Sequence, residues 1–476
     1  MDKYKKLMSN TLIFALGQLG AKVLSFFLLR LYTAQLSTSG YGISQIFFDT
    51  MNVIYPIVTF SMADAIIRFG MDSDFDRRKV YTNANVMTLL GITVFAVFTP
   101  LMNSVSVYKG YTFLIFVYCF FSCFRQLAAQ YVRAKGIVRL FALDGILATF
   151  TIFISNLIFM KGLNLGIIGY ILSFIVSDFL SLIFLVICGN LGKSFDTKFF
   201  DKDLIKEMLR FSAPLIPTYL LWWITSSSDK WFIIKWVSGN ENGLYSASTK
   251  LPYLLLMVTQ IFFNAWQMSS IEERDSKTLG SFYNKVYDAY SSVIFMAAAF
   301  LMIFSGPLTG ILTSKPEYAK SAVYSVILIE AMVFQCMCQF LSSVYNVKKK
   351  SKNSAITACV AAGVNIILNI ILIPKYQVYG AAIATALSYF ACFAVRIVDT
   401  RRYVPFSVKY GKLAVNLLLI TLLCVVMVKQ GKLYIVWAIV LFLLIMLLNV
   451  SAVIKTAKRI LKKRRPSASA PRTAEK

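Results

Sequence analysis

Residues 166–188 read GIIGYILSFIVSDFLSLIFLVIC, and Asp178 is the only charged residue among them. A helix of about 20 mainly apolar residues is long enough to cross the hydrocarbon core of a bilayer. We therefore expect this stretch to be a membrane-spanning helix. Because an ionisable group inside a membrane is costly, Asp178 is expected to face a cavity or a partner, although the sequence does not identify that partner.

The same length criterion predicts fourteen spans along the chain. In order, they cover residues 11–36, 42–69, 80–102, 111–132, 140–160, 166–188, 208–235, 243–268, 286–304, 321–345, 354–373, 377–395, 413–428 and 433–454. The composition agrees, because 58% of the residues are hydrophobic and only 15% are charged, whereas about a quarter are charged in soluble domains. We predict an all-α polytopic membrane protein with about 14 transmembrane helices.

The basic residues indicate the orientation of the chain. It contains 49 Lys and Arg and 22 Asp and Glu, which gives a formal net charge of +27. With both termini in the cytoplasm, every inside loop carries more Lys and Arg than any outside loop, as the positive-inside rule requires. We therefore predict a multi-pass membrane protein with both termini in the cytoplasm. The basic tail from Lys455 is expected to lie on anionic membrane lipids, and Pro466–Lys476 to be disordered.

Several classes of function are excluded by composition. The chain has no histidine, which removes His-based triads, HExxH zinc sites and His-ligated haem. Its 8 cysteines lie in or beside apolar runs, at spacings that suit neither a zinc nor a redox site. We predict no metal and no cofactor. No nucleic-acid partner is expected either, because no basic-aromatic motif lies outside the apolar segments. The predicted outside loops are too short for an enzyme active site.

The two halves of the chain share landmarks in the same order. Gly40-Tyr41-Gly42 follows the first span and Gly243-Leu244-Tyr245 follows the seventh, while Gly166 to Gly169 opens the sixth span and Gln377 to Gly380 opens the twelfth. Six spans is an even number, so the two repeats run parallel to each other. The predicted domains are an N-lobe at 1–190, a C-lobe at 191–410, two further helices at 411–455 and a basic, partly disordered tail at 456–476.

Taken together, these landmarks resemble those of the multidrug/oligosaccharidyl-lipid/polysaccharide exporter superfamily, and most closely its polysaccharide flippase branch of the O-antigen type. The residues that carry the resemblance are Gly17 to Lys22, Arg30, Gly40 to Gly42, Arg133 to Gly136, Pro214, Asp229-Lys230, Gly243 to Ser246, Lys250, Pro374-Lys375 and Gly380 to Thr385. The resemblance implies two six-helix lobes in a V shape around a central cavity. It also implies a flippase for undecaprenyl-diphosphate-linked oligosaccharide that works by alternating access.

Four cations inside the predicted spans are candidates to bind the substrate diphosphate: Lys22, Arg30, Lys230 and Lys250. Lysine and arginine both bind phosphate by charge-assisted hydrogen bonds. The glycines Gly42 and Gly243 of the two halves are 201 residues apart. At this offset Lys230 falls one position from Arg30, so the two lobes could present a cation at similar depth. The alternatives are that Lys22 pairs with an acidic side chain and that Arg30 snorkels toward the membrane surface.

Polar and aromatic side chains in the same spans are candidates to contact sugar. Gln260, Asn264 and Gln267 fall on one helix face at positions i, i+4 and i+7. The remaining candidates are Gln18 and Asn52, as cavity polar groups, and Trp223 and Trp266, whose rings could stack on sugar faces.

Acidic residues in the spans have two possible roles. Asp49 and Asp229 are candidates for ion coupling by H+ or Na+, and both could instead be structural counter-charges. Asp64 and Arg68 are spaced for an intrahelical ion pair. Arg125 is either a cavity cation or the partner of Asp144.

Two other transporter functions remain open. A drug/cation antiporter of the same superfamily would use an acidic cavity with Asp49 as its best candidate, and a flippase for the peptidoglycan precursor lipid II would differ mainly in the glycan. The expected partners are a polyprenyl-diphosphate glycolipid substrate, membrane lipids and, in a biosynthetic assembly, a glycan polymerase or glycosyltransferases.

Overall fold

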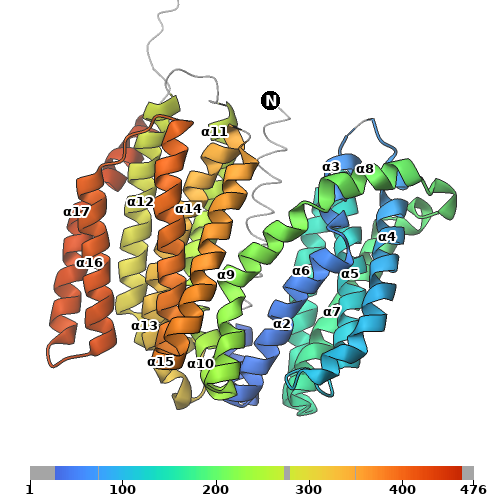
Figure 1. Ribbon diagram of the computed structural model, residues 1–476, viewed down its shortest axis with the longest axis horizontal. Helices are drawn as coiled ribbons and strands as arrows, with labels where there is room; N and C mark the ends of the chain where they lie inside the picture. Colours follow the sequence, from blue (N-terminus) through green and yellow to red (C-terminus); the bar gives the residue numbers. More distant parts are fainter. Residues whose placement is uncertain (1–26, 73, 273–278, 349, 464–476) are drawn as a thin grey trace, which may run out of the picture. The chain divides into compact units, whose positions relative to one another are not determined.

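The computed structural model describes residues 27–72, 74–272, 279–348 and 350–463, and all regular secondary structure in these ranges is helical. This confirms the predicted all-α class. Packing divides the chain into two compact units. The first contains the chain up to Ala247 with Thr309–Ser321 and Ala361–Thr385, and the second contains Ser248–Leu308, Ala322–Val360 and the chain from Ala386. Each is a bundle of long helices (Figure 1).

The described part of the first unit opens with a helical segment at residues 27–35. Its further helices are α2 (Thr38–Val58), α3 (Met62–Gly70), α4 (Arg77–Phe98), η1 (Thr99–Ser104), α5 (Thr112–Ala134), α6 (Val138–Asn156), η2 (Leu157–Gly162), α7 (Gly166–Cys188), η3 (Leu191–Ser194), η4 (Thr197–Phe199), α8 (Lys202–Ser212), α9 (Leu215–Trp236), α10 (Gly239–Ser248) and η5 (Pro316–Lys320). Helices α5, α6 and α7 pack along one another. A core of small and branched apolar side chains, including Ile66, Ala84, Leu127 and Met208, joins α3, α4, α5 and α8.

The second predicted span is broken rather than continuous. α2 and α3 meet at a bend of 55°. Phe60 and Ser61 at the break have φ of 51° and 52°, in the left-handed region that L-residues seldom occupy. Ser61 N donates to Pro56 O, which satisfies a carbonyl that the interrupted helix leaves open. The sequence criterion detects the apolar run but not this break.

The second unit contains most of the remaining helices. They are α11 (Tyr253–Glu272), α12 (Leu279–Ile303), α14 (Ser321–Val347), η6 (Thr400–Arg402), α16 (Tyr410–Lys429) and α17 (Tyr434–Lys463), while α13 (Ser305–Leu312) and α15 (Ser351–Asp399) contribute residues to both units. Helices α12, α16 and α17 pack together. An aromatic cluster around Trp266 and Phe340, whose ring centroids are 5.1 Å apart, joins α11 to α14.

α15 contains two predicted spans, 354–373 and 377–395, within its 49 residues. Its helical geometry fails at Gln377, whose φ is 52° and ψ is −129°. A Cβ on Gly380 would overlap Leu372 O and lie 2.9 Å from Ile373 N. In a straight helix, residues eight positions apart are about 12 Å apart along the axis, so the chain must fold back here. The two predicted spans are therefore separate helical segments.

The same backbone features occur at the corresponding landmark of the first half. Gly166 has a φ of 56°, and a Cβ on Gly169 would lie 3.0 Å from Phe159 O. Thus Gly166 matches Gln377 in its positive φ, and Gly169 matches Gly380 in its close approach to a preceding carbonyl. The sequence repeat has a local structural counterpart at this turn.

In the described ranges, nine helices are long and apolar enough to cross a membrane, or ten if α2 and α3 form one span. Several features account for the difference between this count and the fourteen predicted spans. Much of the first span lies before residue 27, and α15 counts once. α9 and α11 do not qualify by apolarity because they carry polar residues such as Asp229, Lys230 and Gln260.

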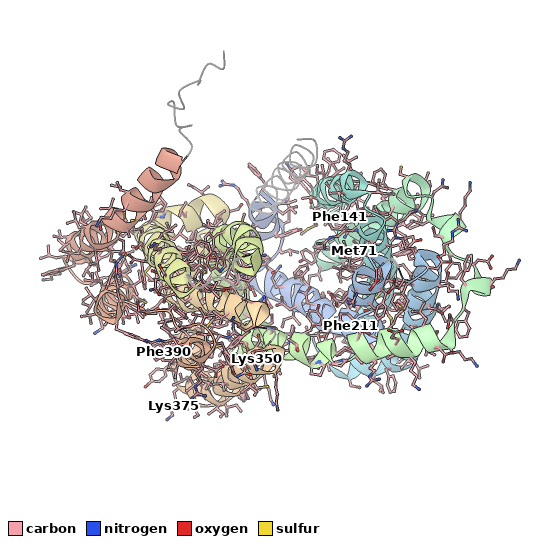
Figure 2. The ribbon with its side chains drawn as sticks, turned by 90° about the horizontal axis from the view of Figure 1, so that it is seen from above. Met71, Phe141, Phe211, Lys350, Lys375 and Phe390 are labelled. Atoms are coloured by element: carbon pink, nitrogen blue, oxygen red, sulfur yellow. The ribbon has the colours of Figure 1, made fainter. Side chains whose placement is uncertain are left out.

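Large apolar side chains cover the outer surfaces of the helices. Met71 is 64% exposed, and Phe211 and Phe390 are 38% and 42% exposed (Figure 2). A single exposed apolar side chain is common on soluble proteins. The long rows of exposed apolar side chains on α16 and α17 are not typical of the surface of a soluble protein. These rows agree with an integral membrane protein, whose outer helix faces contact lipid.

Candidate functional site

The centre of the candidate site is a buried ion pair in the first unit. Lys230 Nζ on α9 lies 2.5 Å from Asp49 Oδ2 on α2, and the two side chains are only 6% and 11% exposed. Trp223, two turns earlier on α9, donates its Nε1–H to Asp49 O at 2.9 Å. Removing one member of such a pair leaves a buried charge without compensation, which is strongly unfavourable. The pair therefore links α2 to α9.

The local sequence of α9 explains why Lys230 reaches α2. Ser226-Ser227-Ser228 precedes Asp229 and Lys230, and small side chains allow helices to approach closely in a membrane. Successive residues of a helix point about 100° apart. Lys230 thus faces α2, while Asp229 faces a different group of helices.

Asp229 is the centre of a second buried polar cluster. Its Oδ2 accepts hydrogen bonds from Tyr245 Oη at 2.6 Å and from Thr385 Oγ1, and its Oδ1 accepts one from Asn369 Nδ2 at 2.6 Å. Asn369 Nδ2 also donates to Asn365 Oδ1 at 3.0 Å. The donors come from α10 and from both helical segments of α15. No basic side chain in the described ranges forms an ion pair with Asp229.

The groups in contact with Asp229 are neutral hydrogen-bond donors. The amide nitrogen of Asn369 faces Asp229 Oδ1, while the hydroxyls of Tyr245 and Thr385 donate to Oδ2. Asn369 Oδ1 is buried and accepts no hydrogen bond among the described residues. Across the described chain, no group of three or more His, Cys, Asp or Glu is placed to hold a metal ion. The cluster is therefore one buried carboxylate among neutral polar groups.

Asp178, the aspartate of the predicted span 166–188, belongs to a third charged cluster. Arg125 on α5 lies between two carboxylates, with Nη2 3.1 Å from Asp144 Oδ2 on α6 and Nη1 3.1 Å from Asp178 Oδ1 on α7. The planar guanidinium of arginine can serve two carboxylates at once. Of the two predicted roles of Arg125, pairing with Asp144 is confirmed, and Asp178 is a second partner that the sequence does not identify.

A set of close contacts connects the start of α2 to α10 and to residues 311–317. A Cβ on Gly42 would lie 2.8 Å from Gly243 N, and Asn242 Nδ2 donates to Gly42 O at 3.1 Å. Thr38 Oγ1 donates to Glu317 Oε2 at 2.8 Å. Further contacts to backbone oxygens come from Arg30 Nη1 to Ile311 O at 2.8 Å and from Lys315 Nζ to Leu36 O at 2.6 Å. We call these contacts the α2–α10 clasp.

The remaining candidate residues have varied surroundings. Lys250 is half-buried where α10 meets α11, and Asn52 is exposed on α2. Gln260 is exposed and accepts a hydrogen bond from Gln339 at 3.0 Å. Trp266 is 4% exposed and donates to Ser343 Oγ at 2.9 Å, so protein side chains already cover its ring. Gln18 and Lys22, and the side chains of Asn264 and Gln267, lie outside the described residues.

One predicted pairing near the break after α2 is wrong. Arg68 Nη1 binds Asp72 Oδ2 at 3.0 Å rather than Asp64. Asp64 instead accepts a hydrogen bond from Tyr219 Oη at 2.9 Å. Both choices fit the i, i+4 spacing along a helix, so spacing alone does not decide between them.

Sequence patterns assign no role to the residues that surround Asp229. Tyr245 and Thr385 stand out only as landmarks of the repeat, and Asn365 and Asn369 are not among the predicted site residues. One local signal is present, since Asn365 and Asn369 are four residues apart and so share a face of an otherwise apolar span. Their convergence on Asp229 depends on tertiary packing, which that signal does not contain.

Charged and polar clusters buried between apolar helices are a common feature of polytopic membrane proteins with a functional interior. Solved structures of transporters share the fold. A lipid II flippase, MurJ, in an inward closed conformation has a TM-score of 0.70 at 15% identity and covers 94% of this chain and 100% of its own. An inward-facing MATE-family multidrug transporter of the MOP superfamily has a TM-score of 0.69 at 14% identity and covers 82% of this chain and 98% of its own. A mutant of the Vibrio cholerae MATE transporter VcmN has a TM-score of 0.60 at 12% identity and covers 84% of this chain and 96% of its own.

The family follows from the sequence itself. A polysaccharide biosynthesis protein family matches residues 7–271, which is more than half of the chain, and the chain belongs to that family. A search of curated protein sequences finds no match. The structural neighbours are named as transporters and a flippase, and together with the family match they confirm the predicted membership of the multidrug/oligosaccharidyl-lipid/polysaccharide exporter superfamily.

Proposed function

We propose that this chain is a flippase that moves undecaprenyl-diphosphate-linked oligosaccharide from the inner to the outer leaflet of the bacterial cytoplasmic membrane. Both termini are placed in the cytoplasm, as the distribution of Lys and Arg indicates. The observation that supports the proposal best is the buried Lys230–Asp49 pair, together with membership of a polysaccharide biosynthesis family. A buried lysine paired with a carboxylate is a cation that a more strongly charged anion can take over.

The diphosphate of the substrate competes with Asp49 for Lys230 in this mechanism. Phosphate oxygens form strong charge-assisted hydrogen bonds with lysine, and a diphosphate carries more negative charge than one carboxylate. Arg30, Lys22 and Lys250 supply further positive charge along the route. When Lys230 moves to the diphosphate, Asp49 loses its partner and α2 is released from α9. The substrate thus favours a second conformation by its different affinity for the two states.

The α2–α10 clasp is the element that must open for release. By the predicted topology, its residues Gly42 and Gly243 lie beside the outer ends of their spans. In the described structure the clasp is closed, and the polar contacts of Thr38 and Arg30 support it. We assign it the role of the outer gate, which separates when the lobes rock. The polyprenyl tail stays in the lipid throughout, so only the headgroup needs a polar path.

The Asp229 cluster is the better candidate for ion coupling of the two predicted carboxylates. Asp49 is already neutralised by Lys230, whereas Asp229 is surrounded by neutral hydroxyl and amide groups. Because those groups come from α9, α10 and α15, a cation or proton at Asp229 would hold these helices together. Ion binding and release there would drive the return of the empty carrier.

Reconstitution tests this function directly. Proteoliposomes containing the full chain and a fluorescent lipid-linked oligosaccharide report flipping as the fraction accessible to an external glycosidase. We expect Lys230→Gln to reduce the rate by about tenfold or more, because a hydrogen bond to a charged group is worth roughly 1.5–3 kcal/mol. Lys235→Gln, on the exposed side of the same helix, is the matched control and retains the rate. Equal rates for both variants would contradict the proposal.

Two alternatives share the fold and are separated in the same vesicles. Lipid II replaces the oligosaccharide substrate in one arm, and a cationic drug replaces it in another. A flippase for polysaccharide precursors moves the lipid-linked oligosaccharide fastest and leaves the drug untransported. Drug efflux that survives Lys230→Gln but is lost in Asp49→Asn would instead identify an antiporter.

A further inference from the structure

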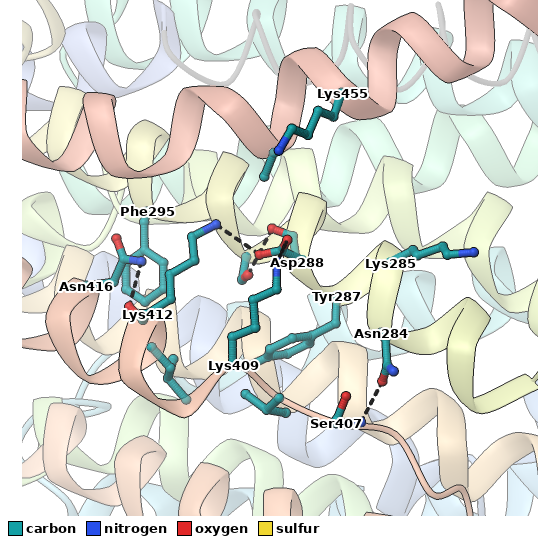
Figure 3. Close-up of a pocket in the computed structure, with 14 residues that line it drawn as sticks. Asn284, Lys285, Tyr287, Asp288, Phe295, Ser407, Lys409, Lys412, Asn416 and Lys455 are labelled. Atoms are coloured by element: carbon teal, nitrogen blue, oxygen red, sulfur yellow. Dashed lines mark hydrogen bonds and ion pairs between the residues drawn. The ribbon is translucent and has the colours of Figure 1, made fainter.

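A basic pocket belongs to the second unit, whereas the Lys230 and Asp229 clusters belong to the first. It is bounded by α12, residues 407–409, α16 and α17, and its volume is about 380 Å3 (Figure 3). Four of its lining residues are lysines and one is acidic: Lys285, Asp288, Lys409, Lys412 and Lys455. The lining therefore carries an excess of positive charge that nothing in the flipping mechanism uses.

The single carboxylate of the pocket is shared by two of the lysines. Asp288 Oδ1 lies 2.9 Å from Lys412 Nζ, and Asp288 Oδ2 lies 2.8 Å from Lys409 Nζ. Lys412 Nζ also donates to Ser292 Oγ at 2.8 Å. Within the described residues, Lys285 and Lys455 form no ion pair. Among the described residues, the ammonium groups of Lys285 and Lys455 therefore have no anionic partner, whereas Asp288 is held by the other two lysines (Figure 3).

The pocket lies at the level where an apolar helix surface ends. Leu418 on α16 and Leu447 on α17 are 60% and 71% exposed, as expected of side chains in contact with lipid tails. Lys412 precedes Leu418 on α16, and Lys455 follows Leu447 on α17 by about two helical turns. Asn449 Nδ2 donates to Asn416 Oδ1, a lining residue of the pocket, at 2.6 Å and so links α17 to α16. The lysines are therefore at headgroup depth, where membrane proteins bind anionic lipids.

We propose that this pocket binds the phosphate headgroup of an anionic phospholipid. The lipid tails lie along the exposed apolar face of α16 and α17, and the phosphate contacts Lys285 and Lys455. A volume of about 380 Å3 is sufficient for a phosphoglycerol headgroup. A lipid bound here ties the C-terminal helices to α12, which supplies Lys285 and Asp288.

Native mass spectrometry of the full chain in mixed micelles measures the binding. The probes are phosphatidylglycerol and phosphatidylcholine of the same chain length, with inorganic phosphate as a soluble competitor. We expect phosphatidylglycerol to be retained over phosphatidylcholine. The double variant Lys285→Gln/Lys455→Gln should bind phosphatidylglycerol about 25-fold more weakly, because each lysine near an anionic headgroup contributes roughly fivefold.

Matched variants keep the test independent of folding. Lys429→Gln/Lys432→Gln makes the same change in charge at the other end of the α16–α17 hairpin and should leave binding within twofold. Asp288→Asn should act in the opposite direction and strengthen phosphatidylglycerol binding several-fold, while thermal melting reports whether it folds. The proposal is overturned if the two lipids bind equally, if Lys285→Gln/Lys455→Gln binds as the wild type does, or if inorganic phosphate displaces the lipid at equal concentration.

Discussion

Gly42 and Gly243 lie directly against each other, with a Cβ on Gly42 2.8 Å from Gly243 N. A Cβ on Gly243 would overlap Thr38 O. These two glycines are corresponding landmarks of the sequence repeat, so the α2–α10 clasp is a contact between equivalent positions of the two halves. Only glycine allows the two backbones to approach this closely.

Replacing Gly243 with Ala should therefore weaken the clasp. The added methyl group has no space beside Thr38 O, and overpacking of this kind costs about 1–3 kcal/mol. A lower melting temperature and faster labelling of a cysteine introduced beside the clasp would report its opening. Gly145→Ala is the control, because a Cβ there meets nothing within 4 Å on helix α6. That variant should be neutral or slightly stabilised, as alanine favours a helix by about 1 kcal/mol over glycine.

The Arg125 cluster should be sensitive to loss of its cation. Arg125→Gln leaves the carboxylates of Asp144 and Asp178 buried side by side, and breaking a buried pair costs roughly 3–5 kcal/mol. Arg125→Lys should recover only part of this, because one ammonium cannot reproduce the two-sided geometry of the guanidinium. Thermal melting in detergent measures both. A melting temperature of Arg125→Gln equal to that of a surface variant such as Arg133→Gln would contradict a structural role.

The stability of the fold should depend on pH through Asp201, the residue that caps the N-terminus of α8. The backbone N–H of Leu204 and the ammonium of Lys79 both lower the pKa of Asp201. A carboxyl group with a lowered pKa stabilises the fold at pH values above its unfolded pKa, about 3.9, and this contribution is lost as the pH falls through the lower folded pKa. The difference in melting temperature between wild type and Asp201→Ala should be constant above about pH 5 and shrink below pH 4. A difference that grows on acidification would contradict this assignment.

Ion coupling should depend on Asp229. Asp229→Asn keeps a hydrogen-bonding side chain of similar size among Tyr245, Asn369 and Thr385 but removes the charge. We expect flipping by this variant to become independent of an imposed Na+ or H+ gradient, while its affinity for the lipid-linked substrate is unchanged. Gradient-dependent flipping in Asp229→Asn, together with its loss in Asp49→Asn, would move the coupling role to Asp49.

Local sequence features predict the helices well and their contacts poorly. The apolar length of 166–188 is sufficient to predict α7. The repeated landmarks predict that Gly166 to Gly169 and Gln377 to Gly380 open corresponding spans, but not the turns that the structure has there. The partner of Lys230 could not be predicted, because Asp49 is far away in the sequence and only packing of α2 against α9 brings them together.

Trp266 illustrates the same limit for the sugar contacts. A tryptophan in a polar span fits either a cavity wall or an aromatic core. The choice depends on Phe340 and Ser343 of α14, which cover the ring and bind its N–H. Such information is tertiary, so composition and spacing cannot supply it.

The central claim is that the substrate diphosphate displaces Asp49 from Lys230. Equilibrium binding of a lipid-linked oligosaccharide to the purified chain, compared among wild type, Asp49→Asn and Lys230→Gln, tests it most directly. We expect Asp49→Asn to bind several-fold more tightly than wild type because the competing carboxylate is gone, and Lys230→Gln to bind about tenfold more weakly or worse. Weaker binding by Asp49→Asn, or unchanged binding by Lys230→Gln, would contradict it.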